Sequence, residues 1–298
     1  ELAFLFGAIV VVTGPTVIIP ILRIVRPNPK VANVLRWEGI VIDPLGALLA
    51  VLVFDFIISG QQHNVLSTML LAFGKIILSG FLIGFISAWS LGSLLRKQLV
   101  PQYLRNIFTL ISVLTVFVLS EMIQSESGLL AVTVMGITMA NMKDMDIDNI
   151  LDFKESLSVL LISVLFIVLA ARIEIDELIF VGWPAIVLLG IIILIARPVA
   201  VFASSIGSDL SFNEKLVIAW IGPRGIVAAA ISALFALRLE DAGFSEAALL
   251  VPLTFVIIIG TVVIQSTTAK HIAEFLKVRE PPPTGLLIVG AGNVARAI

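Results

Sequence analysis

Long apolar runs separated by short polar connections dominate this chain. Most of these runs come close to or exceed the ~20 residues that a helix needs to cross the hydrocarbon core of a bilayer. Their apolar residues follow one another without the alternation that a barrel strand would show. The pattern therefore predicts an all-α polytopic membrane protein with about nine transmembrane helices, at residues 2–22, 36–58, 66–95, 104–122, 127–142, 155–171, 178–204, 213–237 and 248–269.

The composition agrees with a membrane protein. Hydrophobic residues make up 59% of the 298 residues and charged residues 13%, and the mean hydropathy is +1.13. A soluble domain carries about twice that share of charge. The net charge of −2 says nothing about partners, and there is no basic run to suggest nucleic acid. The lack of cysteine excludes disulfides and thiolate metal sites.

The distribution of lysine and arginine over the connections predicts the orientation in the membrane. Alternate connections, counted together with the tail, hold thirteen of these residues against two in the others. Because cytoplasmic loops carry the excess of positive charge, the richer set is expected on the cytoplasmic side. The sequence thus predicts a multi-pass protein of the cell (inner) membrane with a cytoplasmic C-terminus.

The two ends indicate an internal part of a longer protein. The chain begins at Glu1 rather than at a methionine and stops within an apparent helix, so transporter helices are expected before residue 1. We assign residues 1–278 to a transmembrane domain and 279–284, which contain three consecutive prolines, to a stiff linker. Residues 285–298 are assigned to the beginning of a nucleotide-binding domain.

That last assignment depends on a short apolar strand followed by a glycine turn. Gly290, Gly292 and Ala295 have the GxGxxA spacing that opens a dinucleotide-binding fold. The motif predicts an α/β Rossmann-like domain and implies NAD(H) or another nucleotide as its cofactor. The alternative is a chance match in a glycine-rich chain.

Asp43 is the first candidate functional residue. A charge near the middle of a membrane costs about 2.5–3.5 kcal/mol on insertion scales, so such residues usually pair or line a wet cavity. Asp43 lies roughly 10 Å into its helix, and Pro44 beside it removes a backbone donor. This arrangement favours a site for a cation or a proton. The alternative is a structural aspartate paired with a lysine.

Glu38 and Arg224 are predicted to form a structural ion pair. Glu38 points ~140° away from Asp43 around the helix, so the two carboxylates do not share a proton. Arg224 lies near the middle of the eighth apolar run and needs a compensating charge. Lys75 and Arg197 are expected instead to reach the membrane surface or to pair locally.

Two helices are predicted to be interrupted. Thr13, Gly14 and Pro15 lie at the centre of the first run, where glycine and proline open the hydrogen-bond ladder. The freed carbonyls and the threonine hydroxyls are candidate ion ligands. A second interruption is expected in the ninth run, at Gly260, Thr261 and Gln265. Paired interruptions predict an inverted-repeat transporter with a midplane site, whereas simple packing kinks are the alternative.

These motifs together resemble those of the cation:proton antiporter family, of the sodium/proton exchanger type. VVTGPTV (residues 11–17) is similar to the family's T-D-P-V break, EGIVID (38–43) to its E-S-x-x-N-D motif, and GPRG (222–225) to its G-x-R-G motif. The order of the three is kept, and residues 254–275 look like the family's last broken helix. Gly14, Gly39 and Ile42 depart from the family by replacing its polar residues.

The resemblance implies roles for individual residues. Asp43 matches the essential ion-binding aspartate, Glu38 and Arg224 match the structural ion pair, and Thr13 matches a backbone or hydroxyl ligand. It also implies a homodimer and a C-terminal module of the TrkA-N/RCK-like nucleotide-binding type.

The predicted function is exchange of a monovalent cation, sodium or potassium, for protons, by alternating access around Asp43. A nucleotide-gated cation channel is one alternative, although no filter-like loop is present. A membrane sensor without transport activity is another. An enzyme would need a nucleophile–base pair or a metal cluster within the helices, and with no cysteine and only His63 and His271, both in connections, the sequence offers neither.

Overall fold

The computed structural model describes residues 2–59, 65–124, 126–142, 148–171 and 175–280. Over these ranges the chain is almost entirely helical and contains no strand, only two isolated bridges. The predicted nucleotide-binding segment lies outside the described residues. The elements are α1 Leu2–Val11, α2 Pro15–Val25, α3 Pro29–Ser59, α4 Val65–Arg96, η1 Gln102–Leu104, α5 Arg105–Ile123, α6 Gly128–Ala140, α7 Asp148–Ala171, α8 Ile175–Ile191, the π-helix η2 Ile192–Ala196, α9 Arg197–Ser204, α10 Phe212–Trp220, α11 Ile226–Asp241, η3 Ser245–Leu249 and α12 Leu250–Phe275.

The helices occupy the apolar runs, because a backbone in lipid must satisfy its hydrogen bonds within its own segment. Each of the nine predicted ranges coincides with one helix or with consecutive helices. The number of membrane crossings stays a prediction. Among the described residues, five helical segments are long and apolar enough to span a bilayer: Pro29–Ile58, Leu71–Arg96, Gln102–Ile123, Val181–Ser204 and Glu246–Phe275.

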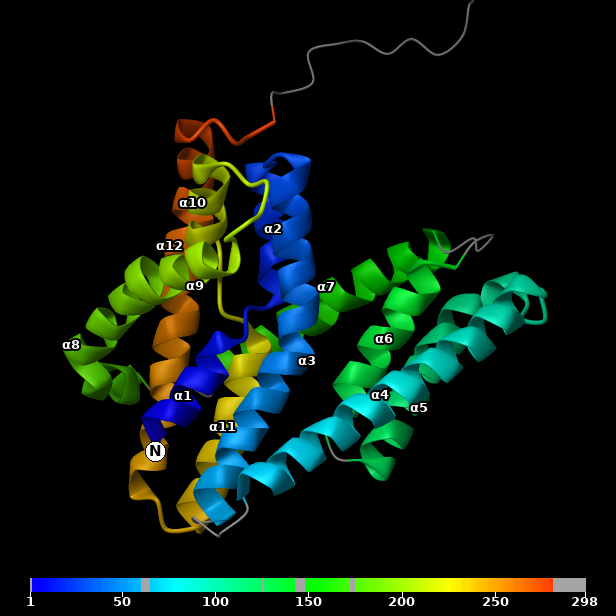
Figure 1. Ribbon diagram of the computed structural model, residues 1–298, viewed down its shortest axis with the longest axis horizontal. Coiled ribbons are helices and arrows are strands. Elements are labelled where there is room, and N and C mark those ends of the chain that lie inside the picture. The colour runs from blue at the N-terminus through cyan, green and yellow to red at the C-terminus, as the bar shows by residue number, and fades with distance from the viewer. Residues whose placement is uncertain (1, 60–64, 125, 143–147, 172–174, 281–298) are drawn as a thin grey trace, which may run out of the picture.

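The helices form two groups. Helices α4, α5 and α6 pack on one another and lean away together on one side of Figure 1, and α7 packs on α5. The remaining helices surround α3 and α12, and α3 also contacts α4 and α6. An ion pair between Arg23 of α2 and Glu155 of α7 adds a further link between the groups.

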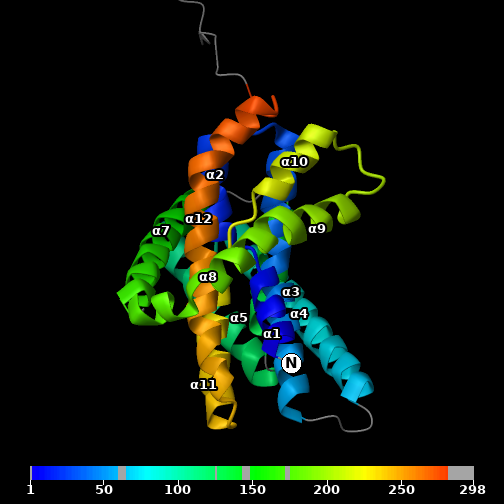
Figure 2. The same cartoon turned by 90° about the vertical axis from the view of Figure 1, so that its left-hand side faces the viewer.

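Two interruptions divide the larger group across its middle. The first, at residues 12–14, separates α1 from α2 and agrees with the prediction, because Gly14 precedes Pro15 at the first position of α2. The second lies at residues 221–225, between α10 and α11. The prediction of an interruption at Gly260 was wrong: α12 is one continuous helix, which Figure 2 shows as the long element of the larger group.

The interruptions lie between two apolar clusters. One cluster joins α2, α3, α10 and α12 through Ile18, Leu35 and Val217, among others. The other joins α1, α3, α11 and α12 and includes Leu5 and Phe235. Both clusters are tightly buried, so they hold α1, α2, α10 and α11 in place. They thereby fix the point at which the two interruptions cross.

Candidate functional site

The two interrupted segments cross in direct backbone contact. The backbone N–H of Gly14 donates to the carbonyl of Pro223 at 3.3 Å, and Thr13 and Arg224 form an antiparallel bridge. A Cβ atom on Gly14 would lie 2.8 Å from the Cα of Gly225, and one on Gly225 would lie 2.7 Å from the Cα of Gly14. Only glycine at both positions allows this approach.

Two polar side chains of α12 support the second interruption. Thr261 Oγ1 accepts the backbone N–H of Arg224 at 3.2 Å, and Gln265 Oε1 accepts that of Gly222 at 3.0 Å. Both side chains are fully buried. Thr261 and Gln265 were predicted as parts of a broken helix. They lie instead in the continuous helix α12 and act as hydrogen-bond partners of the neighbouring interruption. Gly260 packs against Leu189 of α8, which a Cβ would approach to 2.3 Å.

Asp43 lies on the face of α3 that packs against the first interruption. Gly39, Asp43 and Gly46 share this face, within about 60° of one another around the helix. A Cβ on Gly39 would lie 3.2 Å from Pro15, and one on Gly46 would lie 2.5 Å from a methyl of Val12. Asp43 is placed between these two contacts and therefore faces residues 12–15.

The Asp43 carboxylate keeps an oxygen available. Its Oδ1 is buried and has no hydrogen-bond partner among the residues that the structure describes. Helix α3 remains continuous through Pro44, so the unwound backbone beside Asp43 comes from the neighbouring chain segment and not from its own helix. Burying a carboxyl group without a partner costs free energy, unless a bound ligand supplies one.

Glu38 pairs with Arg197 and not with Arg224, which corrects the predicted ion pair. The contact is two-pronged: Arg197 Nη2 donates to Glu38 Oε2 at 2.8 Å, and Nη1 donates to Oε1. Arg197 Nη2 also donates to the carbonyl of Ile221 at 2.9 Å. The side chains are only 11% and 22% exposed. Thr13 Oγ1 approaches Glu38 Oε1 at 3.5 Å, so the pair borders the first interruption.

Arg224 instead caps the broken end of α1. Its Nη1 donates to the carbonyl of Val11, the last residue of α1, at 2.8 Å. The carbonyls at a helix end lack partners within the helix and carry partial negative charge. A buried arginine both donates a hydrogen bond to such a carbonyl and offsets its partial negative charge. The backbone carbonyl thus compensates part of the positive charge of Arg224. Glu38 is therefore available for another partner.

The sequence held a signal for Arg197 that its interpretation missed. Arg197 is the only charged residue between Glu177 and Asp209. An arginine isolated in so long an apolar run needs a buried partner as much as Arg224 does. The π-helix η2 ends directly before it, and such bulges are frequent at functional sites.

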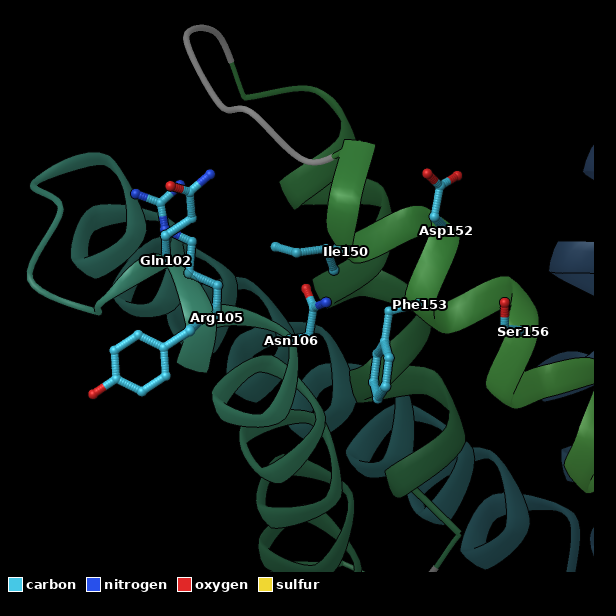
Figure 3. A pocket seen from close by; sticks show the side chains of 8 residues that line it. Gln102, Arg105, Asn106, Ile150, Asp152, Phe153 and Ser156 are labelled. Atoms are coloured by element: carbon cyan, nitrogen blue, oxygen red, sulfur yellow. The ribbon is translucent and has the colours of Figure 1, made fainter.

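A separate cavity of about 730 Å³ lies between η1, the start of α5 and α7 (Figure 3). Arg105 and Asn106 line one side, and Asp152 and Phe153 line the other. None of the predicted site residues contributes to its lining. Of those residues, Gly290, Gly292 and Ala295 lie outside the described part of the chain, so the nucleotide site stays a prediction.

Comparisons with known proteins identify a family and several similar proteins. Residues 1–275 match the family described as sodium/hydrogen exchanger, transmembrane. The chain is 31% identical over 267 residues to Na(+)/H(+) antiporter 1 of Methanocaldococcus jannaschii, covering 88% of this chain and 63% of that protein. It is 27% identical to the K(+)/H(+) antiporter NhaP of Alkalimonas amylolytica, covering 94% of this chain and 48% of that protein.

The fold is similar to a solved structure. The sodium proton antiporter MjNhaP1 from Methanocaldococcus jannaschii superposes with a TM-score of 0.76 at 25% identity, over 91% of this chain and 70% of that one. The chain therefore spans about half to two thirds of the length of these relatives.

Proposed function

This chain belongs to the sodium/hydrogen exchanger family, and on that premise we propose that it exchanges a monovalent cation, sodium or potassium, for protons across the membrane. The observation that carries the proposal is the placement of Asp43. Its carboxylate faces the interrupted segment and has a buried oxygen without a partner among the described residues, whereas Glu38 is held by Arg197. Asp43 is thus the acid of the crossing that is available to a cation or a proton.

Exchange then follows from competition for one carboxylate. A proton on Asp43 removes the negative charge that attracts a cation, and a bound cation opposes protonation. Because Glu38 is committed to its ion pair and position 14 is glycine, one proton exchanges for one monovalent cation. Transport on these terms is electroneutral. Backbone carbonyls at residues 12–14 and the Thr13 side chain complete the surroundings.

Alternating access requires the crossing to face one side of the membrane and then the other. The two helix groups offer the natural moving parts, because few contacts join the α4–α7 group to the rest. We place the C-terminus in the cytoplasm and the protein in the inner membrane, since the ends of α2, α4 and α12 carry the lysine and arginine excess. A homodimer is proposed from the family resemblance.

Proton flux in proteoliposomes tests the proposal. The protein is reconstituted with a pH-sensitive dye inside, and gradients of sodium, potassium or lithium are imposed in turn. We expect a cation-driven change of internal pH that Asp43→Asn abolishes. The matched control is Asp209→Asn, which removes an exposed carboxylate in a connection and should leave the flux unchanged. Flux that survives Asp43→Asn in folded protein would rule out the mechanism.

Residues 285–298 are proposed to begin a cytoplasmic nucleotide-binding domain that regulates transport. The support is the spacing of Gly290, Gly292 and Ala295 after an apolar strand. NAD(H) is the first ligand to test, by adding it to the cytoplasmic face of the same vesicles. A flux that stays unchanged, together with no binding of labelled NADH, would remove this part of the proposal.

A further inference from the structure

Thr16, the second residue of α2, places its hydroxyl beside the crossing of the two interruptions. Thr16 Oγ1 lies 3.3 Å from the position that a Cβ on Gly14 would take and 3.8 Å from that of a Cβ on Gly225. The close approach of the two backbones leaves no room for a side chain at residues 14 and 225. Thr16 therefore supplies a side-chain oxygen next to this contact.

The Thr16 hydroxyl also differs from the other threonine hydroxyls of the crossing. Thr13 Oγ1 approaches Glu38, and Thr261 Oγ1 donates to the carbonyl of Ile257 at 2.7 Å while accepting the N–H of Arg224. Thr16 Oγ1 is buried and makes no hydrogen bond within the described ranges. A buried hydroxyl without a partner costs free energy, and beside the crossing a bound ligand would supply that partner.

We propose that Thr16 Oγ1 is a ligand of the transported cation. The inference rests on the proposed function, because it assigns a second ligand to the site of Asp43. Alkali cations bind oxygen atoms that replace their hydration shell, and a hydroxyl offers lone pairs without adding charge. Asp43 then supplies the negative charge and Thr16 a neutral oxygen.

The two ligands have separable effects. Protons compete for Asp43, whereas a threonine hydroxyl does not titrate in the working range. Losing the Thr16 oxygen should therefore weaken cation binding without removing proton binding. The Michaelis constant for the cation rises, and the maximal rate at saturating cation stays close to that of the unchanged protein.

Three variants test this in the proteoliposome assay. Thr16→Val keeps the shape and removes the oxygen, and Thr16→Ser keeps the oxygen. We expect Thr16→Val to raise the KM for the cation about tenfold, in line with the loss of one oxygen ligand. Thr16→Ser should stay within about twofold by the same reasoning. Thr109→Val is the matched control, since Thr109 Oγ1 on α5 is also buried and unpaired among the described residues.

The outcomes separate this inference from the proposed function. If the unchanged protein exchanges and Asp43→Asn does not, the proposed function stands, and an unaltered KM in Thr16→Val overturns the role of Thr16 alone. A KM raised equally by Thr109→Val also overturns it, because the effect would then be one of general packing. If Thr16→Val does not fold, Thr16→Ala compared with Thr16→Ser decides by the same criterion.

A binding measurement gives a second readout. Sodium or potassium raises the melting temperature of a protein that binds it in the folded state. The cation concentration giving half of this shift should rise about tenfold in Thr16→Val, following the same loss of one ligand. An unchanged half-saturating concentration would contradict the inference even if transport were impaired.

Discussion

Arg197 holds the carboxylate of Glu38 with both of its terminal nitrogens, although 159 positions separate the two residues. Arg197 also donates to the carbonyl of Ile221, where the second interruption begins. The pair therefore ties α3 to the end of α10. Its role is to hold the crossing in shape, and this can be tested through stability.

Breaking this pair from one side should be strongly destabilising. Arg197→Met leaves the carboxylate of Glu38 buried without its cation, which costs about 3–5 kcal/mol in buried pairs. We expect a loss of this size in the free energy of unfolding in mixed detergent micelles. Adding Glu38→Gln to Arg197→Met should recover part of the loss, because the stranded charge is then gone.

The Arg23–Glu155 pair is the matched control, because it is exposed at 63% and 51% of the two side chains. Arg23→Ala should cost no more than about 1 kcal/mol, as exposed pairs do. Equal losses at the two pairs would contradict the structural role given to Glu38 and Arg197.

The two glycines of the crossing should not tolerate a methyl group. Gly14→Ala and Gly225→Ala each place a Cβ less than 3 Å from backbone atoms of the other segment. Overpacking of this kind costs about 1–3 kcal/mol, and the backbone must move to relieve it. We expect lower melting temperatures and slower exchange in both variants.

Gly136→Ala on α6 provides the comparison, because a Cβ there meets nothing within 4 Å. It should raise stability by about 0.5–1 kcal/mol, the usual gain of alanine over glycine inside a helix. Gly14→Asp, which restores the acid of the family motif, should be at least as disruptive as Gly14→Ala. A fully stable and active Gly14→Asp protein would show that the crossing is looser than described.

The hydrogen bonds from α12 predict a third effect. Thr261→Val and Gln265→Leu leave the N–H groups of Arg224 and Gly222 buried without these acceptors. Each loss costs about 1–3 kcal/mol. Because the crossing loosens, the turnover rate of exchange should fall along with stability. Ser266→Ala on the same helix is the control: its hydroxyl is exposed and donates only within α12, so both quantities should remain unchanged.

The connection between α5 and α6 predicts a pH effect on stability. Burial first, and then the neighbouring Glu121 carboxylate, raises the pKa of Glu126 above its ordinary value of 4.5, with Arg238 opposing the shift. The folded state therefore holds this proton to a higher pH than the unfolded state does. The free energy of unfolding should fall as the pH rises from about 4.5 towards the raised pKa, and then level off.

Glu126→Gln should remove this fall and raise the melting temperature at neutral pH. Melting temperatures measured in steps between pH 4 and pH 8 check both the sign and the window. Glu240→Gln, at an exposed position near the end of α11, controls for the removal of one negative charge. A melting temperature of Glu126→Gln that is lower than that of the unchanged protein at pH 7 would show that the sign is wrong.

The local features of this protein could be predicted from its sequence. The positions of the helices followed from apolar runs, because hydrophobicity and backbone hydrogen bonding act within one segment. The first interruption followed from Gly14 and Pro15 in the middle of such a run. Membership in the exchanger family was likewise predicted from the three motifs and is confirmed.

The pairing of distant groups was decided by the tertiary structure. Two arginines lie in apolar runs, and Glu38 was predicted to pair with Arg224. The packing of α9 and α10 beside α3 brings Arg197 to Glu38 instead, while Arg224 binds the broken end of α1. The second interruption was likewise assigned to the wrong helix. Glycine and threonine in α12 resemble a break in sequence, but their neighbours make them packing and hydrogen-bonding positions. Local sequence determines where a helix can form or break, whereas the choice among distant partners depends on which helices lie side by side.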